Sequence, residues 1–554
     1  MSGVELGLGI LGAIDVCYRY GKALLETCQA FHDADSRLGE SALRVEVCWM
    51  RIESQLHVVR KLAPSLDERH RDVQQRTLEV LLNKLRMADL RLAKLTKSPD
   101  SQLSQSRSAS SSAMVEARRW KFALMRDGIA EAIADLEAWQ ALFDPAWFLM
   151  MKMASPEVDN QLEMTRKELP HASEKGSSSS IPAARDLRRA LKPEHSSSGG
   201  QSTVFLPQDG LAPSSVRAIH LSTASTAQRV DNGHMVVLDP INCTSRPHVR
   251  FVLKDAREFA KRLKRADPSA FGMLECKGIL QEEGEKQTPS GVSRHAGSTS
   301  GLSFVFRLPS EVAPLQSLRH RLVGGHESRH DSLSERFALA RQLVAAVSYV
   351  HIFGFVHKNI RPETVLLLRR MHGENREGRS ELVENAVLVG FDVLRGADER
   401  TRRVSDEDWE KNLYRHPTRQ GRMPEVDYEM RHDIYSVGVC LLEIGLWENF
   451  VAYEDGDLVP MLGPGLASDG AGEAGTDLLR DPVRLKGRLQ GLARGKLRRN
   501  MGTLYSEVVE TCLTCLDEGN LDFGDEEEFQ DEDGIAVDVR YIEKVVAKLG
   551  SIAI

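Results

Sequence analysis

Residues 356–368 read VHKNIRPETVLLL, a polar loop with a proline that leads into an apolar run. Upstream, residues 332–350 place apolar side chains at helical spacing, and Ser334 and Glu335 lie near the start of that segment. Downstream, residues 385–392 read NAVLVGFD, which is typical of a short β-strand. The sequence therefore predicts a helix, a polar loop and a strand in this order.

This order of segments resembles the catalytic core of protein kinases, whose catalytic loop reads H-R-D-x-x-x-x-N. In that template the Asp accepts the proton of the substrate hydroxyl, and the Asn binds Mg²⁺. Here His357 and Arg361 keep the frame, but Asn359 and Thr364 occupy the two chemical positions. An amide does not take up a proton at neutral pH, and a hydroxyl is a poorer Mg²⁺ ligand than a carboxylate. The resemblance therefore implies a pseudokinase and no phosphoryl transfer.

Two further segments follow the kinase order. The place of the D-F-G triplet is taken by Gly390, Phe391 and Asp392, so the position that should bind Mg²⁺ has lost its carboxylate, while Phe391 can still pack. Asp433 begins an apolar helical segment and matches the kinase residue that binds the backbone of the catalytic loop. By the resemblance, Asp433 is structural, and the C-lobe is built normally.

The expected N-lobe lacks the parts that hold ATP. Residues 201–271 contain two glycines, Gly210 and Gly233, so no G-x-G-x-x-G loop can be written there. Strands are expected at residues 233–240, 273–280 and 301–308, with a helix at residues 245–266 after the first of them.

If that helix is the C-helix of a kinase, Leu238 or Asp239 stands in place of the lysine that contacts the ATP phosphates. Glu258 would then be the glutamate of that helix without its partner, and Lys254 is interpreted as a solvated helix lysine. We expect no cofactor, although nucleotide binding without turnover is compatible with the lost phosphate chemistry.

The first 150 residues carry helical patterns. Apolar side chains recur every three or four residues in two long segments: Leu78, Leu81, Leu85, Ala88, Leu92 and Leu95, then Phe122, Met125, Ile129, Ile133, Leu136, Trp139 and Phe143. With residues 4–31 and 36–61, these segments predict a bundle of at least four helices with a Ser-rich loop at residues 98–112.

The opening VELGLGILGAIDVCYRYGKALL and the close RRWKFALMRDGIAEAIADLEAWQALFDPAWFL of this region resemble the fungal HeLo and HeLo-like domains. A helical bundle followed by a pseudokinase is also similar to the architecture of the necroptosis pseudokinases, whose bundles attack membranes. The resemblance implies an effector bundle that a pseudokinase holds or releases.

The first helix carries the candidate membrane contact. Residues 6–14 form an apolar run of nine residues, too short to cross a bilayer, which needs about 20. Its glycines allow close helix contact, which suits a tight bundle as well as association in lipid. Packing in the bundle and membrane insertion both remain open for its large apolar residues: Leu6, Leu8, Ile10, Leu11 and Ile14.

Composition narrows the remaining classes. A net charge of −7 gives no reason to expect a nucleic-acid partner. Eight scattered cysteines are typical of reduced thiols in a cytosol, and the Cys512 and Cys515 pair lies in a helical pattern that favours a core position over zinc. No metal site is expected. A basic segment at residues 486–499 and an acidic run at residues 517–533 are interpreted as solvated, with partner binding as the alternative.

The expected fold is multidomain: an all-α helical bundle at 1–154, a flexible Ser-rich linker at 155–201, and an α+β, protein-kinase-like bilobal domain at 202–552. Its N-lobe would span 202–310 and its C-lobe 311–552. We expect a catalytically inactive signalling protein that acts in fungal cell death or non-self recognition, is cytoplasmic, and is recruited to membrane on activation.

The partners expected for such a protein are other proteins, further copies of the bundle, and membrane lipid. Two alternatives stay open. One is a scaffold that contacts proteins and no membrane, and the other is an atypical kinase that binds ATP.

Overall fold

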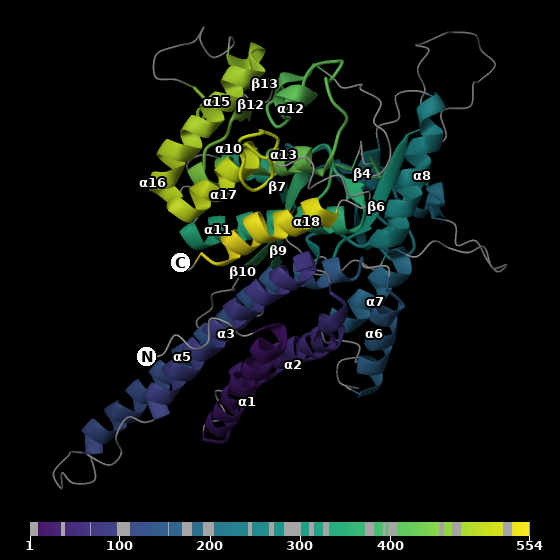
Figure 1. Ribbon diagram of the computed structural model, residues 1–554. Coiled ribbons are helices and arrows are strands. Elements are labelled where there is room, and N and C mark those ends of the chain that lie inside the picture. Colours follow the sequence, from purple (N-terminus) through teal and green to yellow (C-terminus); the bar gives the residue numbers. More distant parts are fainter. Residues whose placement is uncertain are drawn as a thin grey trace, which may run out of the picture. The chain divides into compact units, whose positions relative to one another are not determined.

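The computed structural model divides into two compact units, an N-terminal unit of residues 1–189 and a C-terminal unit of residues 190–554 (Figure 1). The structure describes residues 9–34, 39–66, 68–96, 111–152, 155–168, 180–191, 204–241, 246–264, 271–281, 301–309, 315–324, 332–371, 382–391, 395–396, 407–453, 459–467, 478–524 and 535–552.

The N-terminal unit is a helical bundle, in which α1 and α5 each pack against α2 and α3. Its helices are α1 (Ile10–Ala34), α2 (Gly39–Leu62), η2 (Ala63–Ser65), α3 (Glu68–Thr96), α5 (Ser111–Met150), α6 (Pro156–Glu168) and α7 (Ser180–Leu191). The apolar stripes of α3 and α5 face the core, because Leu78, Leu81, Leu85, Ile129 and Trp139 are fully buried. The Ser-rich loop expected at residues 98–112 lies outside the described residues, apart from the start of α5.

The N-terminal unit extends beyond the boundary expected at residue 154. Part of the expected flexible linker forms α6, which packs against α2, and its basic piece at residues 184–192, for which the sequence favours a short helix, overlaps α7. The buried Arg188 of α7 donates hydrogen bonds to the carboxylate of Asp159 at 2.8 and 3.1 Å and to the carbonyl of Met151 at 2.9 Å. Val158, Leu162 and Leu187 add buried apolar contacts, so these short helices are stabilised by packing and not by helix propensity.

A polar cluster lies within the apolar core of the bundle. Arg51 and Gln55 of α2 donate hydrogen bonds to the buried Asp144 of α5 at 2.5 and 2.9 Å. The next residue, Pro145, lies inside α5 and cannot donate a backbone hydrogen bond. Burial raises the pKa of the Asp144 carboxyl, although Arg51 opposes this shift.

The C-terminal unit begins with a six-stranded sheet formed by its described residues. The strand order is β1-β5-β6-β4-β3-β2, with β1 parallel to β5 and all other pairs antiparallel. The strands are β1 (Phe205–Leu206), β2 (Arg217–Ala218), β3 (Ser225–Gln228), β4 (Met235–Ile241), β5 (Cys276–Gln281) and β6 (Leu302–Arg307). Helix α8 (Arg246–Leu263) connects β4 to β5 and packs against β5.

The rest of the C-terminal unit is mainly helical. Its helices are α10 (Leu318–Val323), α11 (Leu333–Ile352), α12 (Trp409–Asn412), α13 (Met430–Leu446), α15 (Pro482–Leu492), the π-helix η9 (Ala493–Leu497), α16 (Arg498–Met501), α17 (Thr503–Leu513), α18 (Ile535–Tyr541), the π-helix η11 (Ile542–Ala547) and α19 (Lys548–Gly550). Single 3₁₀ turns occur at η4 (Gln208–Gly210), η5 (Pro213–Ser215), η6 (Pro362–Thr364) and η8 (Pro417–Arg419).

Three small sheets join these helices. One has the order β10-β9-β7, and the other two pair β11 with β8 and β12 with β13. Their strands are β7 (Gln316–Ser317), β8 (Phe355–Val356), β9 (Val365–Met371), β10 (Leu382–Leu388), β11 (Arg395–Gly396), β12 (Val451–Tyr453) and β13 (Pro460–Leu462). Together the two units give a multidomain α+β protein.

The central helix α13 is buried along its whole length. It packs against α11 and α17, and it carries Asp433 in its first turn. Helix α11 begins with a capping box in which Ser332 and Glu335 satisfy each other's backbone amides. These two helices therefore form a rigid base beneath the loop that connects α11 to β9.

Candidate functional site

The carboxylate of Asp433 anchors the loop of residues 357–364 through hydrogen bonds. This buried carboxylate accepts hydrogen bonds from the backbone amides of His357 at 2.8 Å and Lys358 at 2.9 Å. The hydroxyl of Tyr428 donates to the same carboxylate at 2.6 Å, and His351 Nε2 lies 3.2 Å from it. Lys358 has a φ of +68°, a strained value for a non-glycine residue. The bonds to Asp433 hold this backbone conformation in place.

His357 is a structural residue of the loop. Its Nε2 lies 3.0 Å from the carbonyl oxygen of Val389, and its Nδ1 accepts a hydrogen bond from the backbone amide of Asn359 at 3.2 Å. This pattern assigns the proton to Nε2. Burial lowers the pKa of His357 to about 4, so the ring is neutral at physiological pH. Both ring nitrogens are therefore used within the protein.

Asn359 occupies the position where the kinase template has its catalytic Asp, and its side chain is bonded inside the loop. The Asn359 Nδ2 donates to the carbonyl of Gly390 at 3.4 Å, and its Oδ1 accepts from Arg361 Nε at 3.0 Å. The amide carries no charge to attract a proton or a metal ion. This position acts as a bridge between two segments of the chain.

Thr364 occupies the position of the metal-binding Asn and faces into the same loop. Its hydroxyl lies 2.9 Å from the carbonyl oxygens of Asn359 and Arg361, and it accepts a hydrogen bond from the Arg361 amide at 3.2 Å. The hydroxyl group is therefore used in closing the 3₁₀ turn η6. Thr364 is fully buried, which leaves no exposed oxygen for a cation.

Gly390 fits this site because it has no side chain. Its φ is +84°, and a Cβ atom at this position would lie 2.3 Å from Thr364 Cγ2. A carboxylate side chain at residue 390 would therefore collide with Thr364. Phe391 is buried, and the centroid of its ring lies 4.6 Å from the ring centroid of Phe259 and 4.7 Å from that of His357. Asp392 lies outside the described residues.

Asp239 contributes a charge that reaches this site from the large sheet. It is fully buried on β4, and its carboxylate accepts hydrogen bonds from the amides of Gly390 at 3.0 Å and Phe391 at 3.0 Å. The sequence put Leu238 or Asp239 in the place of the missing lysine but assigned Asp239 no role. The feature that could have indicated a role is a lone carboxylate in the apolar strand VVLDPI.

The sequence predicted that Glu258 would lack the strand lysine of the kinase template, whose position Leu238 or Asp239 takes. Glu258 on α8 is half-exposed, and its carboxylate lies 3.4 Å from Lys261 on the same helix, a surface pair that does not replace that lysine. Lys254 is exposed, as expected for a solvated lysine. Strand β4 therefore presents the carboxylate of Asp239 to the backbone amides of Gly390 and Phe391.

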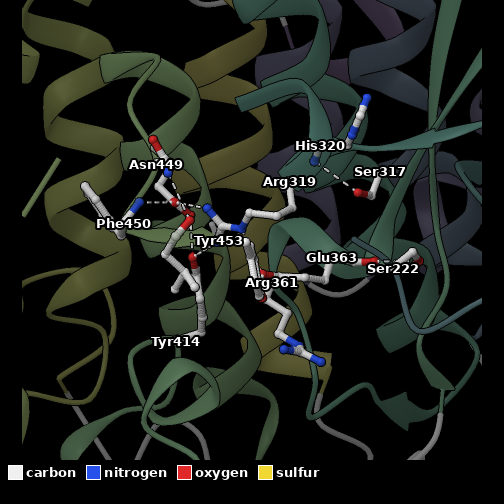
Figure 2. Close-up of polar contacts among 12 residues, drawn as sticks. Ser222, Ser317, Arg319, His320, Arg361, Glu363, Tyr414, Asn449, Phe450 and Tyr453 are labelled. Carbon is white, nitrogen blue, oxygen red and sulfur yellow. Dashed lines mark hydrogen bonds and ion pairs between the residues drawn. The ribbon is translucent and has the colours of Figure 1, made fainter. Parts of the chain in front are cut away.

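A buried ionic cluster lies beside the loop and was missed by sequence reasoning (Figure 2). We name it the arginine cluster: Arg319, Glu363, Tyr414 and Glu443. Arg319 donates to Glu363 at 2.8 Å, to Glu443 at 2.7 Å and to the hydroxyl of Tyr414. Tyr414 in turn donates to Glu443 at 2.6 Å. These residues come from four separate segments, and no spacing in the sequence connects them.

The arginine cluster also fixes the neighbouring backbone. Phe450 donates its amide to Glu443 at 2.7 Å, and Ser222 donates its hydroxyl to the carbonyl of Glu363 at 2.8 Å. Burial raises the pKa of Glu443, whereas Arg319 lowers the pKa of Glu363 against the effect of burial. The cluster therefore ties the loop at residue 363 to α10 and α13 and stabilises the fold around the site.

The candidate membrane residues belong to the bundle. Ile10 and Ile14 are buried on α1, with exposed fractions of 5% and 0%, while Leu11 is 47% exposed. Leu6 and Leu8 lie outside the described residues. Over the part of the chain that the structure describes, no helix has the length and apolar character needed to cross a bilayer.

The described residues of the two units contain no cluster of metal ligands or of reactive thiols. Among the described residues, no group of three or more His, Cys, Asp or Glu side chains could hold a metal ion. Cys512 and Cys515 are fully buried, and burial raises the pKa of both thiols. These thiols are therefore protonated core residues.

Comparison with known proteins adds no relationship: neither a family model nor a curated protein matches the chain.

Proposed function

We propose that this chain is a signalling protein in which an inactive, kinase-like C-terminal unit regulates an N-terminal effector bundle. The arrangement of the C-terminal unit supports this proposal. A sheet with a helix after its β4 strand precedes a helical region, and the loop between α11 and β9 is bonded to Asp433 of α13. This is the order that the kinase resemblance implies.

The single observation that carries the loss of catalysis is the internal bonding of the loop. The polar groups of Asn359 and Thr364 form hydrogen bonds with Gly390, Arg361 and the loop backbone. By the kinase resemblance, Leu238 or Asp239 takes the place of the phosphate-binding lysine, and the buried carboxylate of Asp239 would repel a nucleotide phosphate bound near it. The proposed role is therefore binding and switching, with no phosphoryl transfer.

A phosphotransfer assay with Mg-ATP and a general protein substrate tests this proposal. We expect no transfer and no Mg²⁺-dependent nucleotide binding by the wild-type chain. The variant Asn359→Asp should not restore activity, because Asp239 and Thr364 still block the site. Mg-ATP-dependent phosphorylation that disappears on mutation of His357 or Asp392 would overturn the proposal.

For the N-terminal unit, the resemblance supports an effector role in fungal cell death or non-self recognition, with self-association and membrane contact as its activities. A second candidate function is a scaffold that binds proteins alone. The burial of Ile10 and Ile14 favours this scaffold, because these residues already pack in the bundle.

Leu11 separates the two candidate functions, because it is exposed and can be changed without filling the core. If α1 contacts lipid, Leu11→Asp should abolish binding of the chain to anionic vesicles while the bundle stays folded. Leu43→Asp, at another exposed leucine on α2, is the matched control and should keep binding. A folded wild-type chain that never binds vesicles would leave the scaffold as the function of the bundle.

A further inference from the structure

Part of the basic segment near residue 490 lies on the exposed side of a continuous helix, whereas its Lys486 is buried and paired with Asp517. Helix α15, the π-helix η9 and α16 follow one another without a break from Pro482 to Met501. In Figure 1 they lie at the outer edge of the C-terminal unit, and they pack against α13 and α17. The buried side of this helix is apolar: Leu485, Leu489, Leu492, Ala493 and Leu497.

The opposite side carries Arg494, which is paired with Glu510, and four further arginines without an acidic partner among the described residues. Arg484, Arg488, Arg498 and Arg499 are exposed, and none forms an ion pair or a side-chain hydrogen bond within the part of the chain that the structure describes. Arg484 and Arg488 share a face because they lie four residues apart, and Arg498 and Arg499 lie one after the other on the next α-helical segment. Four unpaired guanidinium groups therefore point to solvent from one helix.

Glycines separate these arginines. Gly487, Gly491 and Gly495 recur every fourth residue on the same face; all three are exposed, and an added Cβ atom would meet nothing within 4 Å. Glycine destabilises a helix interior relative to alanine, and the fold itself does not require it at these positions. The glycines leave the backbone open between the arginines, so that a rod-shaped partner could approach closely.

We propose that this face, which we name the arginine face, binds a helix of a protein partner that carries a row of carboxylates. Guanidinium groups bind carboxylates with two parallel hydrogen bonds, which suits paired arginines on a fixed helix. The net charge of −7 opposes any large polyanion, so the partner that we propose carries a limited row of carboxylates along one helix. A membrane partner is disfavoured because the apolar side of α15 is already buried in the C-terminal unit.

This interaction is independent of the proposed loss of catalysis, since the arginine face does not contact the loop of residues 357–364. It would give the C-terminal unit a docking surface for an acidic helix. Binding should weaken with salt, because the arginines are exposed and Debye screening reduces their attraction.

The test measures binding of the full chain to a synthetic alanine-rich helix with glutamates spaced one turn apart. We expect Arg484→Glu combined with Arg488→Glu to weaken binding at least about tenfold, because each substitution places like charges together. The matched control combines Arg217→Glu with Arg422→Glu, two exposed arginines outside this helix with the same change in net charge. This control should bind nearly as well as wild type.

A second variant tests the glycines separately from charge. Gly487→Gln combined with Gly491→Gln should raise Tm by about 2–4 °C, since glutamine favours the helix. The same variant should weaken peptide binding at least about tenfold, because its side chains fill the space between the arginines. Gly519→Gln, at an exposed glycine with equal space around it, should leave binding unchanged.

Three results would overturn the proposal. One is equal binding by the arginine variant and its control. Another is equal binding of an acidic peptide broken by prolines, which would reduce the effect to attraction of any polyanion. The third is binding to phosphatidylserine vesicles, lost in the arginine variant, with no binding of the helical peptide, because that result assigns the face to a membrane surface.

Discussion

Both units bury a charged group among apolar side chains, but they differ in how completely the surrounding polar atoms are hydrogen-bonded. In the arginine cluster, Arg319 has three partners, and one buried carboxylate oxygen, Glu363 Oε2, lacks a hydrogen bond within the described residues. In the bundle, Asp144 has two partners, but several buried atoms around it lack a hydrogen bond: Arg51 Nε, Gln55 Oε1, Gln74 Oε1 and Trp147 Nε1.

This difference indicates where each unit can open. A more completely bonded polar cluster resists separation, whereas a less completely bonded one loses less when its helices part. The polar cluster of the bundle also lies next to Pro145, which weakens the last turns of α5. We infer that the bundle opens more readily at this end than the C-terminal unit does around Arg319.

The largest expected effect comes from breaking the arginine cluster. Arg319→Met leaves Glu363 and Glu443 buried without their cation, which should destabilise the C-terminal unit by about 3–5 kcal/mol. Hydrogen exchange of α11 and α13 in the full chain measures this loss. Arg422→Met removes an exposed ion pair with Glu407 and should cost less than about 1 kcal/mol. Equal losses would contradict the role of the cluster.

Acid should destabilise the C-terminal unit more than the bundle. Burial lowers the pKa of His357 to about 4 and the pKa values of His416 and His432 to about 3. Their unfolded forms bind protons below about pH 6.5 while the folded forms do not, so stability falls as pH drops from about 6.5 to 4. For His357 alone the loss reaches about 3 kcal/mol at pH 4.

The bundle contains a group with the opposite sign. Burial raises the pKa of Asp144, so the folded bundle binds this proton more tightly than the unfolded chain, and acid favours its folded form at this residue. Hydrogen exchange followed from neutral pH to about pH 4 should show protection lost first in the C-terminal unit. Earlier loss in the bundle would break the comparison.

Asp433 and Asn359 allow a smaller test within the site. Asp433→Ala leaves the amides of His357 and Lys358 and the hydroxyl of Tyr428 without their acceptor, at a cost of about 1–3 kcal/mol. Asn359→Ala loses one long and one ordinary hydrogen bond and should cost less. Denaturant titration gives both values, and equal costs would count against Asp433 as the anchor of the loop.

The smallest effect is expected in the bundle. Gln74→Met removes an amide whose Oε1 has no hydrogen bond and whose Nε2 donates to the Ala146 carbonyl at 3.2 Å. Because the lost bond is offset by removal of an unsatisfied group, stability should change by less than about 1 kcal/mol. Thermal unfolding of this variant beside Thr77→Val, a buried hydroxyl with two acceptors, provides the contrast. A large loss for Gln74→Met would show that the bundle is fully bonded there.

The local elements followed from sequence because their signals are local. The apolar spacing of residues 332–350 predicted the helix that the structure places at α11, and the strand expected at residues 233–240 overlaps β4. The substitutions at Asn359, Thr364 and Gly390 could likewise be read directly, since they concern residue chemistry. The flexible linker expected at residues 155–201 was wrong over α6, because its apolar residues are few. Their burial depends on contacts of α6 with α2, and α7 is bonded to α6.

By itself, the sequence determined the helical patterns, the order of the motif segments and the uncharged residues at Asn359, Thr364 and Gly390. Only the tertiary structure decided that Asp239 meets Gly390, 151 residues away, and that Arg319 meets Glu443, 124 residues away. Such contacts carry no periodic signal, because a buried charge must find its partner wherever the folded chain brings one within hydrogen-bonding distance. The sequence therefore indicated which residue types stand in the loop, and the fold decided which groups form hydrogen bonds with them.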